Sequence, residues 1–587
     1  MDTTDLISRR PWATAVTVSA LALMCYLAPL HSWTGDDIDG DTSAAQLLPI
    51  AILRYHSLDF TALIRRHPEL LNEGKLPFYF QESHGRVVSS YPIVPGLLNV
   101  PCFAVANALG LDLYHYRFLL SFFTAALECA ASVGLMFLAL DAAFPRETAV
   151  GFAVVYALGT AVWSEASRAA WQHASSLFLL GGVFAVILRL TKTRGGVDRW
   201  LPFAGFLLGL EVWNRPSSML IALPLAAFVL HERRYRALGF LIGAAGPLLL
   251  MAGYTYLFCS SIYAMGQGQN FHAGFDGEML HGMLGVLFSP NRGLLVFDPI
   301  FVPSLAILVA SFFSHTIPVL YRYLAVATGL TLLCYSRWSM WWGGWCFSYR
   351  LLIELVPILV VALALAWQRW ISGRRMAKWC FGIALFYSFG VHFLGAFYYP
   401  ASKFDTSPDN IDDDQRRLWD VQNGELARDS RLFAEDVRQI ATGQFPRPSI
   451  NWLPVNPQVI DWSLDNDASP VPVPNGPQKP PTLFVFAGPE AGGSLDLVDQ
   501  TNIQGWAYDP EQPDEPIAIT IFDNGTPLIS FVANVDRSDL AELGFGNGRH
   551  GFAIQTPAQL LDGGPHEVSA RVVGSNIQLN FSPKKLP

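Results

Sequence analysis

The stretch Trp12-Ala-Thr-Ala-Val-Thr-Val-Ser-Ala-Leu-Ala-Leu-Met-Cys-Tyr-Leu-Ala-Pro-Leu30 indicates the fold class, because it carries no charged side chain. A run of about 20 such residues can cross a hydrocarbon core of roughly 30 Å. Similar runs recur as far as about residue 397. Only 15% of the 587 residues are charged and 51% are hydrophobic, whereas soluble proteins are about 25% charged. The sequence therefore predicts an α-helical polytopic membrane protein.

The basic residues predict how the chain crosses the membrane. With the N-terminus in the cytoplasm, every short loop that carries Lys or Arg lies on the cytoplasmic side, as the positive-inside rule requires. The apolar segment 87–111 would reverse the later loops if it crossed, so we expect it to lie along the membrane or to be re-entrant. About eleven spans result, at roughly 11–31, 117–141, 148–165, 172–190, 200–214, 216–231, 237–259, 293–313, 320–336, 350–368 and 378–398.

Three other features narrow the class of protein. No small-x-small cleavage site follows Leu30, so we expect the first span to stay uncleaved. The seven cysteines include no Cys-x-x-Cys pair and none lies after residue 400, so disulfides do not staple the C-terminal part. The net charge of −9 argues against binding to nucleic acid.

Composition divides the chain into three parts. Residues 1–398 form the expected membrane domain, which has a long first outer loop at 32–116. Within this loop, residues 44–55 are expected to form an amphipathic surface helix, which Pro49 would kink or shorten. Residues 399–481 form a helical and proline-rich connection, with a helix expected over 412–440. Residues 482–587 alternate as about seven short strands around the turn Asp523-Asn-Gly-Thr526, which predicts an extracytoplasmic β-sandwich.

Candidate chemistry begins in the acidic stretch Thr34-Gly-Asp-Asp-Ile-Asp-Gly-Asp-Thr-Ser43, directly after the first span. Charged residues at the ends of spans are costly and are therefore functional candidates. A carboxylate can take a proton from a hydroxyl group, arginine matches phosphate oxygens, and a flat aromatic ring stacks on a sugar. On the expected outer side these residue types gather as Asp41, Trp171, His173, Arg215, Arg292, Trp341, Trp342 and Arg350.

These motifs, taken in order, resemble those of the polytopic GT-C glycosyltransferases that use polyprenyl-phosphate sugars, a group that includes protein mannosyltransferases and bacterial lipid glycosyltransferases. The resemblance covers roughly residues 10–400. The stretches that carry it are Gly40-Asp-Thr-Ser-Ala-Ala-Gln-Leu-Leu-Pro49, Ser89-Ser-Tyr-Pro-Ile-Val-Pro-Gly96, Gly159-Thr-Ala-Val-Trp163, Trp171-Gln-His173, Ser289-Pro-Asn-Arg-Gly293, Trp341-Trp-Gly-Gly344 and Tyr349-Arg350.

The resemblance implies a role for each candidate. An acidic residue of the first outer loop would be the catalytic base, and Asp41 matches by position. Many relatives carry two adjacent acidic residues there, so Asp36 and Asp37 stay open as the alternative. No metal ligand or cofactor is assigned, although four nearby carboxylates could hold a divalent cation. The donor phosphate would be held by Arg292, Arg350, Arg215 and His173, and the substrate cavity would be lined by Tyr91, Trp171, Trp341 and Trp342.

The expected activity is transfer of a hexose or pentose from a polyprenyl-phosphate donor to a glycan, lipid or protein acceptor. It would take place on the outer face of a bacterial inner membrane, in synthesis of cell-envelope polysaccharide. A glycan polymerase or ligase of similar topology is an alternative that would rely on Arg and His in place of a carboxylate. A lipid-linked glycan transporter is another, but its polar residues would lie near the bilayer midplane. The sandwich resembles a module found beside bacterial glycosyltransferases and is expected to contact carbohydrate.

Each candidate also has a structural explanation. The acidic stretch could be a solvated turn, His173 a helix-end residue, Arg215 a residue that snorkels to the interface, and the tryptophans an aromatic belt. Four acidic residues are left out of the expected site, and for Glu354 a pairing with Arg350 four positions earlier is the simplest explanation. The other three are Glu128, Glu211 and Asp298.

Overall fold

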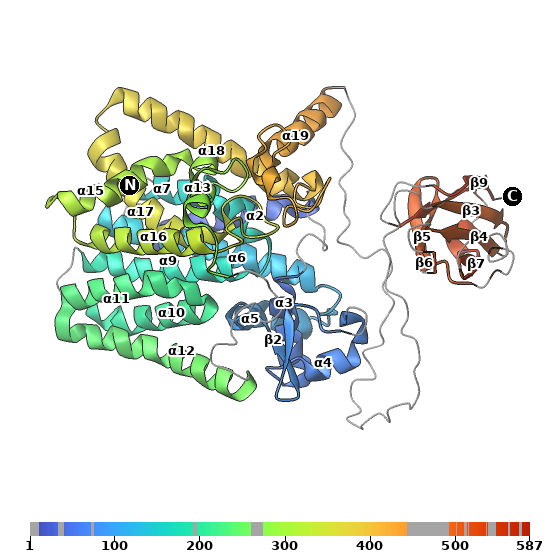
Figure 1. Ribbon diagram of the computed structural model, residues 1–587, viewed down its shortest axis with the longest axis horizontal. Coiled ribbons are helices and arrows are strands. Elements are labelled where there is room, and N and C mark those ends of the chain that lie inside the picture. The colour runs from blue at the N-terminus through green and yellow to red at the C-terminus, as the bar shows by residue number, and fades with distance from the viewer. Residues whose placement is uncertain are drawn as a thin grey trace, which may run out of the picture. The chain divides into compact units, whose positions relative to one another are not determined.

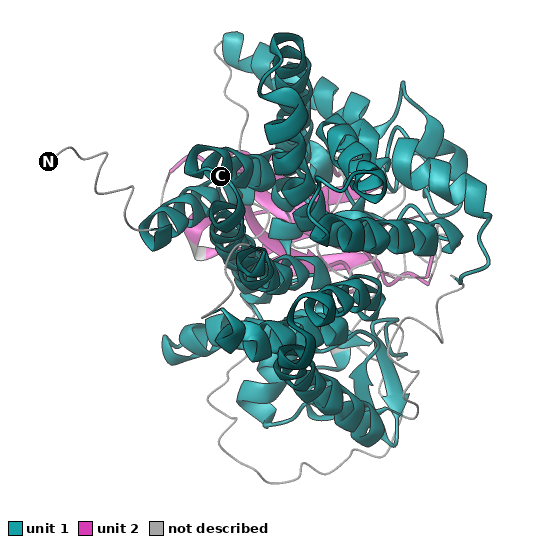
Figure 2. Ribbon diagram, turned by 90° about the vertical axis from the view of Figure 1, so that its left-hand side faces the viewer, with its two compact units in different colours: residues 1–452 teal, residues 453–587 magenta. Residues whose placement is uncertain are grey.

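The computed structural model describes residues 11–32, 40–71, 75–191, 197–259, 274–442 and, with short gaps, 492–586. The chain divides into two units, residues 1–452 and 453–587 (Figure 2). The first unit is helical and the second is built from β-strands. Asp36, Asp37 and Asp39, as well as the strand expected at 482–487, lie outside the described residues.

Every segment that was expected to span the membrane is helical, and Figure 1 shows many of these helices side by side. Within the described residues, seven helical stretches are long and apolar enough to cross a membrane. The prediction of a multi-pass membrane protein is confirmed. The helices that lie at the eleven expected spans are α2 (Pro11–Leu27), α6 (Arg117–Ala143), α7 (Arg146–Leu158), α9 (Gln172–Leu190), α10 (Leu201–Asn214), α11 (Met219–Arg233), α12 (Ala237–Phe258), α15 (Val302–Phe313), α16 (Leu320–Arg337), α17 (Val356–Ala366) and α18 (Arg375–Ser402).

The core of this unit surrounds α9 and α17. Every residue of α17 is buried, which fits a helix that is apolar on all sides. Helices α12 and α18 instead expose large apolar side chains, as expected where a helix faces lipid. His173 lies in the first turn of α9, and Arg350 opens the helix η9 (Arg350–Leu355) that leads into α17. Two of the candidate residues therefore lie at or just before the first turn of these buried helices.

The segment expected to form the first outer loop is folded rather than extended in its described residues. Its elements are α3 (Ser43–Tyr55), α4 (Thr61–Arg66), the hairpin of β1 (Phe80–Ser83) and β2 (Arg86–Ser89), and α5 (Val94–Ala108). Helix α5 has 15 residues, or about 22 Å, which is short of the hydrocarbon thickness. The loop thus forms a cap of short elements, and it supplies Asp41 and Tyr91.

Helix α3 differs from the expected surface helix in two ways. Residues on most of its circumference are buried, so it is enclosed by protein. Pro49 lies inside the helix and does not end it. Proline has no N–H for the carbonyl group four residues earlier, and the side-chain amide of Asn99 donates to that oxygen, of Ala45, at 3.0 Å. The helix tolerates Pro49 because α5 supplies the missing donor.

The segment after α18 packs on the membrane helices instead of forming one long helix. The helix expected over 412–440 is wrong in its first part: a short 3-10 helix η11 (Gln415–Trp419) is followed by turns, and α19 begins only at Glu425 and ends at Ala441. Asp420 accepts backbone N–H bonds from Gln422 and Asn423, which stabilises a turn at that point. The asparagine Asn291 draws the same turn inward, because its side-chain amide donates to the Asp420 carbonyl at 2.9 Å.

Short elements complete the first unit and connect its long helices. Three of them bear on the site because they lie next to candidate residues, namely α8 (Ala161–Ser164), α13 (Met279–Phe288) and α14 (Leu294–Phe297). The others are η1 (Ala28–Ser32), η3 (Pro68–Leu70), η4 (Ala166–Arg168), η5 (Asp198–Trp200), η6 (Pro216–Ser218), η7 (Arg234–Arg236), η8 (Pro299–Phe301) and η10 (Trp367–Ile371).

The second unit is a small β-sandwich, as predicted. Its sheets have the strand orders β3-β4-β7 and β6-β5-β8-β9, and they share one core that includes Leu495, Ile519 and Phe552. The hairpin turn is confirmed, because Asp523 pairs with Thr526 and the two residues between them have positive φ. The strands are β3 (Gly492–Val498), β4 (Asn502–Tyr508), β5 (Ala518–Asp523), β6 (Thr526–Val532), β7 (Gly551–Gln555), β8 (Glu567–Val572) and β9 (Lys584–Lys585), of which β3 and β9 were not anticipated.

Candidate functional site

Asp41 and Arg350 form an ion pair between the residues that precede α3 and the start of η9. Arg350 Nη2 donates to Oδ2 of Asp41. Tyr91, just after β2, donates its hydroxyl hydrogen to Oδ1 of the same carboxylate at 2.5 Å. The side chains of Asp41 and Arg350 are 23% and 13% exposed, so both can be reached from solvent. The loop therefore places a carboxylate, a phenol and a guanidinium together at one accessible point.

Three further contacts fix the guanidinium of Arg350. Its Cζ lies 4.2 Å from the centroid of the Trp171 ring, a cation–π geometry. Its Nε donates to Nε2 of His173 at 3.3 Å. Its Nη1 donates to the carbonyl oxygen of Gly343 at 3.4 Å. The start of α9 therefore holds Arg350 from one side. The tryptophan-rich loop, which we define as residues 338–349, holds it from the other.

His173 connects Arg350 to a second, deeper ion pair. Its Nδ1 lies 2.8 Å from Oε1 of Glu354, and its Nε2 lies 3.3 Å from Nε of Arg350. Arg215 Nη1 lies 2.9 Å from Nδ1 and 3.1 Å from Nε2. Because a guanidinium can only donate, Nε2 accepts from Arg350 and the imidazole is neutral. Arg215 Nη1 lies 3.1 Å from the same Glu354 oxygen, and Arg215 Nη2 donates to the Tyr335 hydroxyl at 2.8 Å. The site therefore contains two arginines and two carboxylates, with a neutral histidine between them.

The electrostatic environment keeps Asp41 ionised. Burial acts to raise the pKa of the Asp41 carboxyl, but the charge of Arg350, together with hydrogen bonds from Arg350 and Tyr91, outweighs it and lowers the pKa below its usual value. A carboxylate of this kind can accept a proton. The Asp41 carboxylate is also bonded to Arg350, the guanidinium that would bind a phosphate group.

Glu354 and Tyr335 are members of the site that sequence reasoning missed. An α-helix would place Glu354 one turn above Arg350, which is why the two were expected to pair. The segment is a 3-10 helix instead, with three residues per turn, so position i+4 is rotated well away from position i. Glu354 accordingly turns to His173 and Arg215. The only feature of the sequence that could have identified Glu354 is its charge inside an expected span. No feature of the sequence identified Tyr335.

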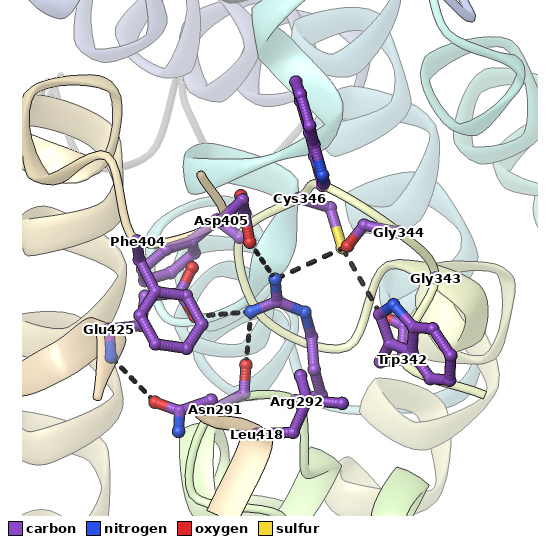
Figure 3. Close-up of polar contacts among 12 residues, drawn as sticks. Asn291, Arg292, Trp342, Gly343, Gly344, Cys346, Phe404, Asp405, Leu418 and Glu425 are labelled. Carbon is purple, nitrogen blue, oxygen red and sulfur yellow. Dashed lines mark hydrogen bonds and ion pairs between the residues drawn. The ribbon is translucent and has the colours of Figure 1, made fainter. Parts of the chain in front are cut away.

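Arg292 was expected to bind the donor phosphate, and the structure places it in a different cluster (Figure 3). It is 1% exposed. Its Nη2 lies 2.5 Å from Asp405 Oδ1, and its Nη1 lies 3.0 Å from Glu425 Oε2. Burial raises the pKa of both carboxyls against the charge of Arg292. The guanidinium is therefore already matched by two carboxylates of the segment that follows α18, and its ion pairs are with these rather than with the Asp41 group.

The tryptophan pair 341 and 342 belongs to the same neighbourhood as Arg292. Both rings are buried. The indole N–H of Trp342 donates to Oδ1 of Asp412 at 2.8 Å, and Trp341 packs against Trp419 with ring centroids 6.1 Å apart. The structure thus brings Tyr91, Trp171, His173, Arg215 and Arg350 together with Asp41. It places Arg292, Trp341 and Trp342 in contact with the segment 403–425 instead.

No metal site is formed by the part of the chain that the structure describes. Within those residues, no group of three or more His, Cys, Asp or Glu side chains is arranged to hold an ion. The neighbouring carboxylates of Asp36, Asp37 and Asp39 lie outside the described residues. The expectation that they could join Asp41 around a divalent cation therefore stays a prediction.

Comparisons with known proteins give distant likenesses. No family model and no curated protein matches the chain. Among solved structures, ArnT from Cupriavidus metallidurans bound to undecaprenyl phosphate aligns at 13% identity with a TM-score of 0.40, over 75% of this chain and 84% of that one. The oligosaccharyltransferase of Archaeoglobus fulgidus in complex with Zn and sulfate aligns at 12% identity with a TM-score of 0.37, over 69% of this chain. This chain spans 58% of the length of the archaeal protein. Alignments at this level of identity do not assign a function, which therefore has to be argued from the chemistry of the site.

Proposed function

We propose that this protein is a membrane glycosyltransferase that takes a sugar from a polyprenyl-phosphate donor. The observation that carries the proposal is the Asp41–Arg350 pair, with Tyr91 on the carboxylate and Trp171 and His173 on the guanidinium. It combines a proton acceptor, a phosphate-binding group and an aromatic surface at one accessible place. The sequence motifs that resemble GT-C glycosyltransferases supply the same residues.

The proposed reaction uses these groups in one displacement. The acceptor hydroxyl loses its proton to Asp41, and its oxygen forms a bond to the anomeric carbon of the sugar. The bond from that carbon to the phosphate oxygen breaks, and polyprenyl phosphate leaves with its electron pair. Arg350 stabilises the negative charge on the leaving phosphate. The acceptor is a glycan, a lipid or a protein, and we place the site on the outer face of a bacterial inner membrane, with the N-terminus in the cytoplasm.

In the proposed reaction the ion pair opens when the donor binds. One N–H of Arg350 Nη2 is bonded to Asp41, and a phosphate oxygen at the other N–H draws the guanidinium away from the carboxylate. Asp41 then loses its cation and gains a neighbouring anion, and both changes raise the pKa of its carboxyl. The carboxylate becomes a stronger base only when a donor is present. Arg215 and Glu354 neutralise each other and keep the deeper part of the site balanced while this happens.

Release of undecaprenyl phosphate from a labelled donor tests the proposal without knowledge of the acceptor. Purified protein in proteoliposomes receives undecaprenyl-phosphate-linked hexoses and pentoses together with a membrane extract as the source of acceptors. We expect one donor to give free undecaprenyl phosphate and a labelled product, and D41N to give neither. A transporter would move the intact donor without breaking it. Full activity of D41N with loss of activity in R350A or H173A would instead favour the polymerase or ligase alternative.

A further inference from the structure

The turn Phe347-Ser-Tyr349, which precedes Arg350, has a strained backbone. Ser348 has φ 61°, in the left-handed region that residues other than glycine rarely adopt. Such a conformation persists where the surrounding contacts hold it, and it is common at functional sites. The side chain that follows this turn is the one that reaches Asp41.

One buried carboxylate holds the start of the turn. The backbone N–H of Phe347 donates to Oε2 of Glu165 at 3.0 Å. Glu165 is 3% exposed, and its Oε1 is buried with no hydrogen-bond partner among the described residues. A carboxylate is expensive to bury. Glu165 follows directly on α8, the short helix that lies next to the tryptophan-rich loop.

A second buried carboxylate holds the end of the turn. The Tyr349 hydroxyl donates to Oδ2 of Asp298 and accepts from the backbone N–H of Ala161, the first residue of α8, at 3.3 Å. Nε2 of His392 lies 3.1 Å from the same Asp298 oxygen, and Nδ1 of His392 lies 2.7 Å from Oγ of Ser164. Three helical segments and the loop therefore meet at Asp298.

The order Ser164, His392 and Asp298 resembles a nucleophile with its base and orienting acid, but burial excludes that role. All three side chains are 0% exposed, so no substrate can reach the Ser164 hydroxyl. Their contacts lead instead to Tyr349 and, through the backbone, to Arg350. What the cluster can do is fix the loop.

We infer that Glu165 and Asp298 are positioning residues, which hold the strained turn so that the guanidinium of Arg350 stands where it meets Asp41 and a donor phosphate. The inference rests on the proposed function only for the identity of the ligand. His392 and Ser164 orient the Asp298 carboxylate. Helix α8 is the base of the arrangement, because it provides Ala161 and Ser164 and is followed at once by Glu165.

A double-mutant cycle on ligand binding tests the inference in the full-length protein. The probe is undecaprenyl phosphate that carries no sugar. We expect E165A and Y349F each to weaken its binding about tenfold, in line with the loss of a hydrogen bond to a charged group, and E165Q to retain binding because the amide oxygen still accepts from Phe347. In the R350A background neither change should weaken binding further, since positioning matters only through Arg350. Additive losses in that background would overturn the inference.

The control variant is E128A. Glu128 is a carboxylate of α6 that accepts a hydrogen bond from the Ser175 hydroxyl at 2.9 Å, and it is not among the residues that hold the turn. E128A should therefore leave the binding of undecaprenyl phosphate unchanged. Equal losses in E128A and E165A would mean that binding responds to general destabilisation, and would overturn the inference.

Labelling of Cys346 tests the same inference without any substrate. Cys346 lies next to the turn and is 2% exposed, so in a variant that retains only this cysteine a maleimide should react slowly. We expect E165A and Y349F to speed the reaction about tenfold or more by loosening the turn, whereas R350A and E128A should not. If R350A fails to weaken binding of undecaprenyl phosphate, the proposed function loses its phosphate residue, and the labelling rates still decide whether Glu165 and Tyr349 hold the turn. Unchanged labelling in both variants would overturn the inference.

Discussion

Asp41 and Arg350, which stand 309 positions apart in the sequence, neutralise each other in an ion pair that remains partly exposed. The two residues have opposite tasks in the proposed reaction, since one takes a proton and the other holds a phosphate. Their pairing makes each task depend on the other. A donor phosphate and the Asp41 carboxylate compete for the same guanidinium nitrogen.

The competition predicts that the two residues affect donor binding in opposite directions. R350A should weaken the binding of undecaprenyl phosphate, because the cation is lost. D41N should bind it at least as tightly as the wild type, because the amide is a poorer competitor for Arg350, while kcat falls by about 10²–10⁴ as expected for loss of a general base. Binding and single-turnover transfer, measured on the same preparations, separate the two effects. Weaker binding in D41N than in R350A would contradict the arrangement.

The pH dependence of kcat/KM should show the pairing in the free enzyme. Arg350 and Tyr91 hold the pKa of Asp41 below its usual value despite burial, so the carboxylate stays ionised until the pH falls below about 4. We expect no acid limb between pH 7 and about 4. In R350A, burial acts without the cation, and the limb should move up by about one pH unit or more. An acid limb near pH 6 in the wild type would show that a different group accepts the proton.

The pair of Glu354 and Arg215 should be more important for stability than for chemistry. Both are buried, and removing one partner of a buried pair costs about 3–5 kcal/mol, because the other charge is left alone. We expect E354A and R215A each to lower the thermal unfolding temperature of the detergent-solubilised protein. The double variant E354A/R215A should lose less stability than the sum of the two single losses. A double variant whose loss equals that sum would show that the residues do not act as a pair.

Sequence patterns predicted the helices well, because long uncharged runs leave few alternatives in a membrane. The positions of Asp41, Tyr91, Trp171, His173, Arg215 and Arg350 were also predicted together, since a common outer side follows from the basic loops. The pairing of Glu354 with Arg350 was predicted wrongly, because the true partners depend on η9 being a 3-10 helix. Hydropathy and charge do not distinguish helix types within one apolar segment.

The surroundings of Arg292 were beyond prediction for a different reason. Asp405 and Glu425 lie 113 and 133 positions after it in the sequence, in the connection that composition described as helical and proline-rich. A charged segment can be a solvated helix or can bring its carboxylates to a buried cation, and only the second requires tertiary contacts. Other tertiary contacts break the helix expected over 412–440. Asp412 bonds to Trp342, and both Arg417 and Glu425 bond to Asn291 through their backbones.

Arg292 should therefore hold the segment 403–425 rather than the donor. R292A removes the partner of two buried carboxyls and should raise amide hydrogen exchange in η11 and α19, and it should lower thermal stability. Binding of undecaprenyl phosphate should change much less than in R350A. The variant W342F, which loses the bond to Asp412 and part of a buried ring but no charge, should raise exchange in η11 by a smaller amount. Loss of binding in R292A equal to that in R350A, with unchanged exchange in α19, would restore Arg292 to the phosphate site.

Docking of α19 should weaken as the pH rises, because of Asp429. Burial raises the pKa of this carboxyl to about 8, whereas in an unfolded chain it is about 3.9. The docked helix keeps a proton that the undocked segment loses, so the contribution to stability is fully present below about pH 4 and falls as the pH rises to about 8. We expect amides of α19 to exchange faster at pH 8.5 than at pH 5, after correction for the intrinsic rate.

Two variants test whether Asp429 is the cause. D429N carries no ionisable group at this position and should reduce the difference in exchange between pH 5 and pH 8.5. It should not abolish that difference, because Asp405 and Glu425 also have raised pKa values. E435Q changes an exposed carboxylate of the same helix and should leave the difference as it is. If D429N and E435Q behave alike, the pH dependence arises elsewhere, and the Asp429 carboxyl is not what couples the docking of α19 to pH.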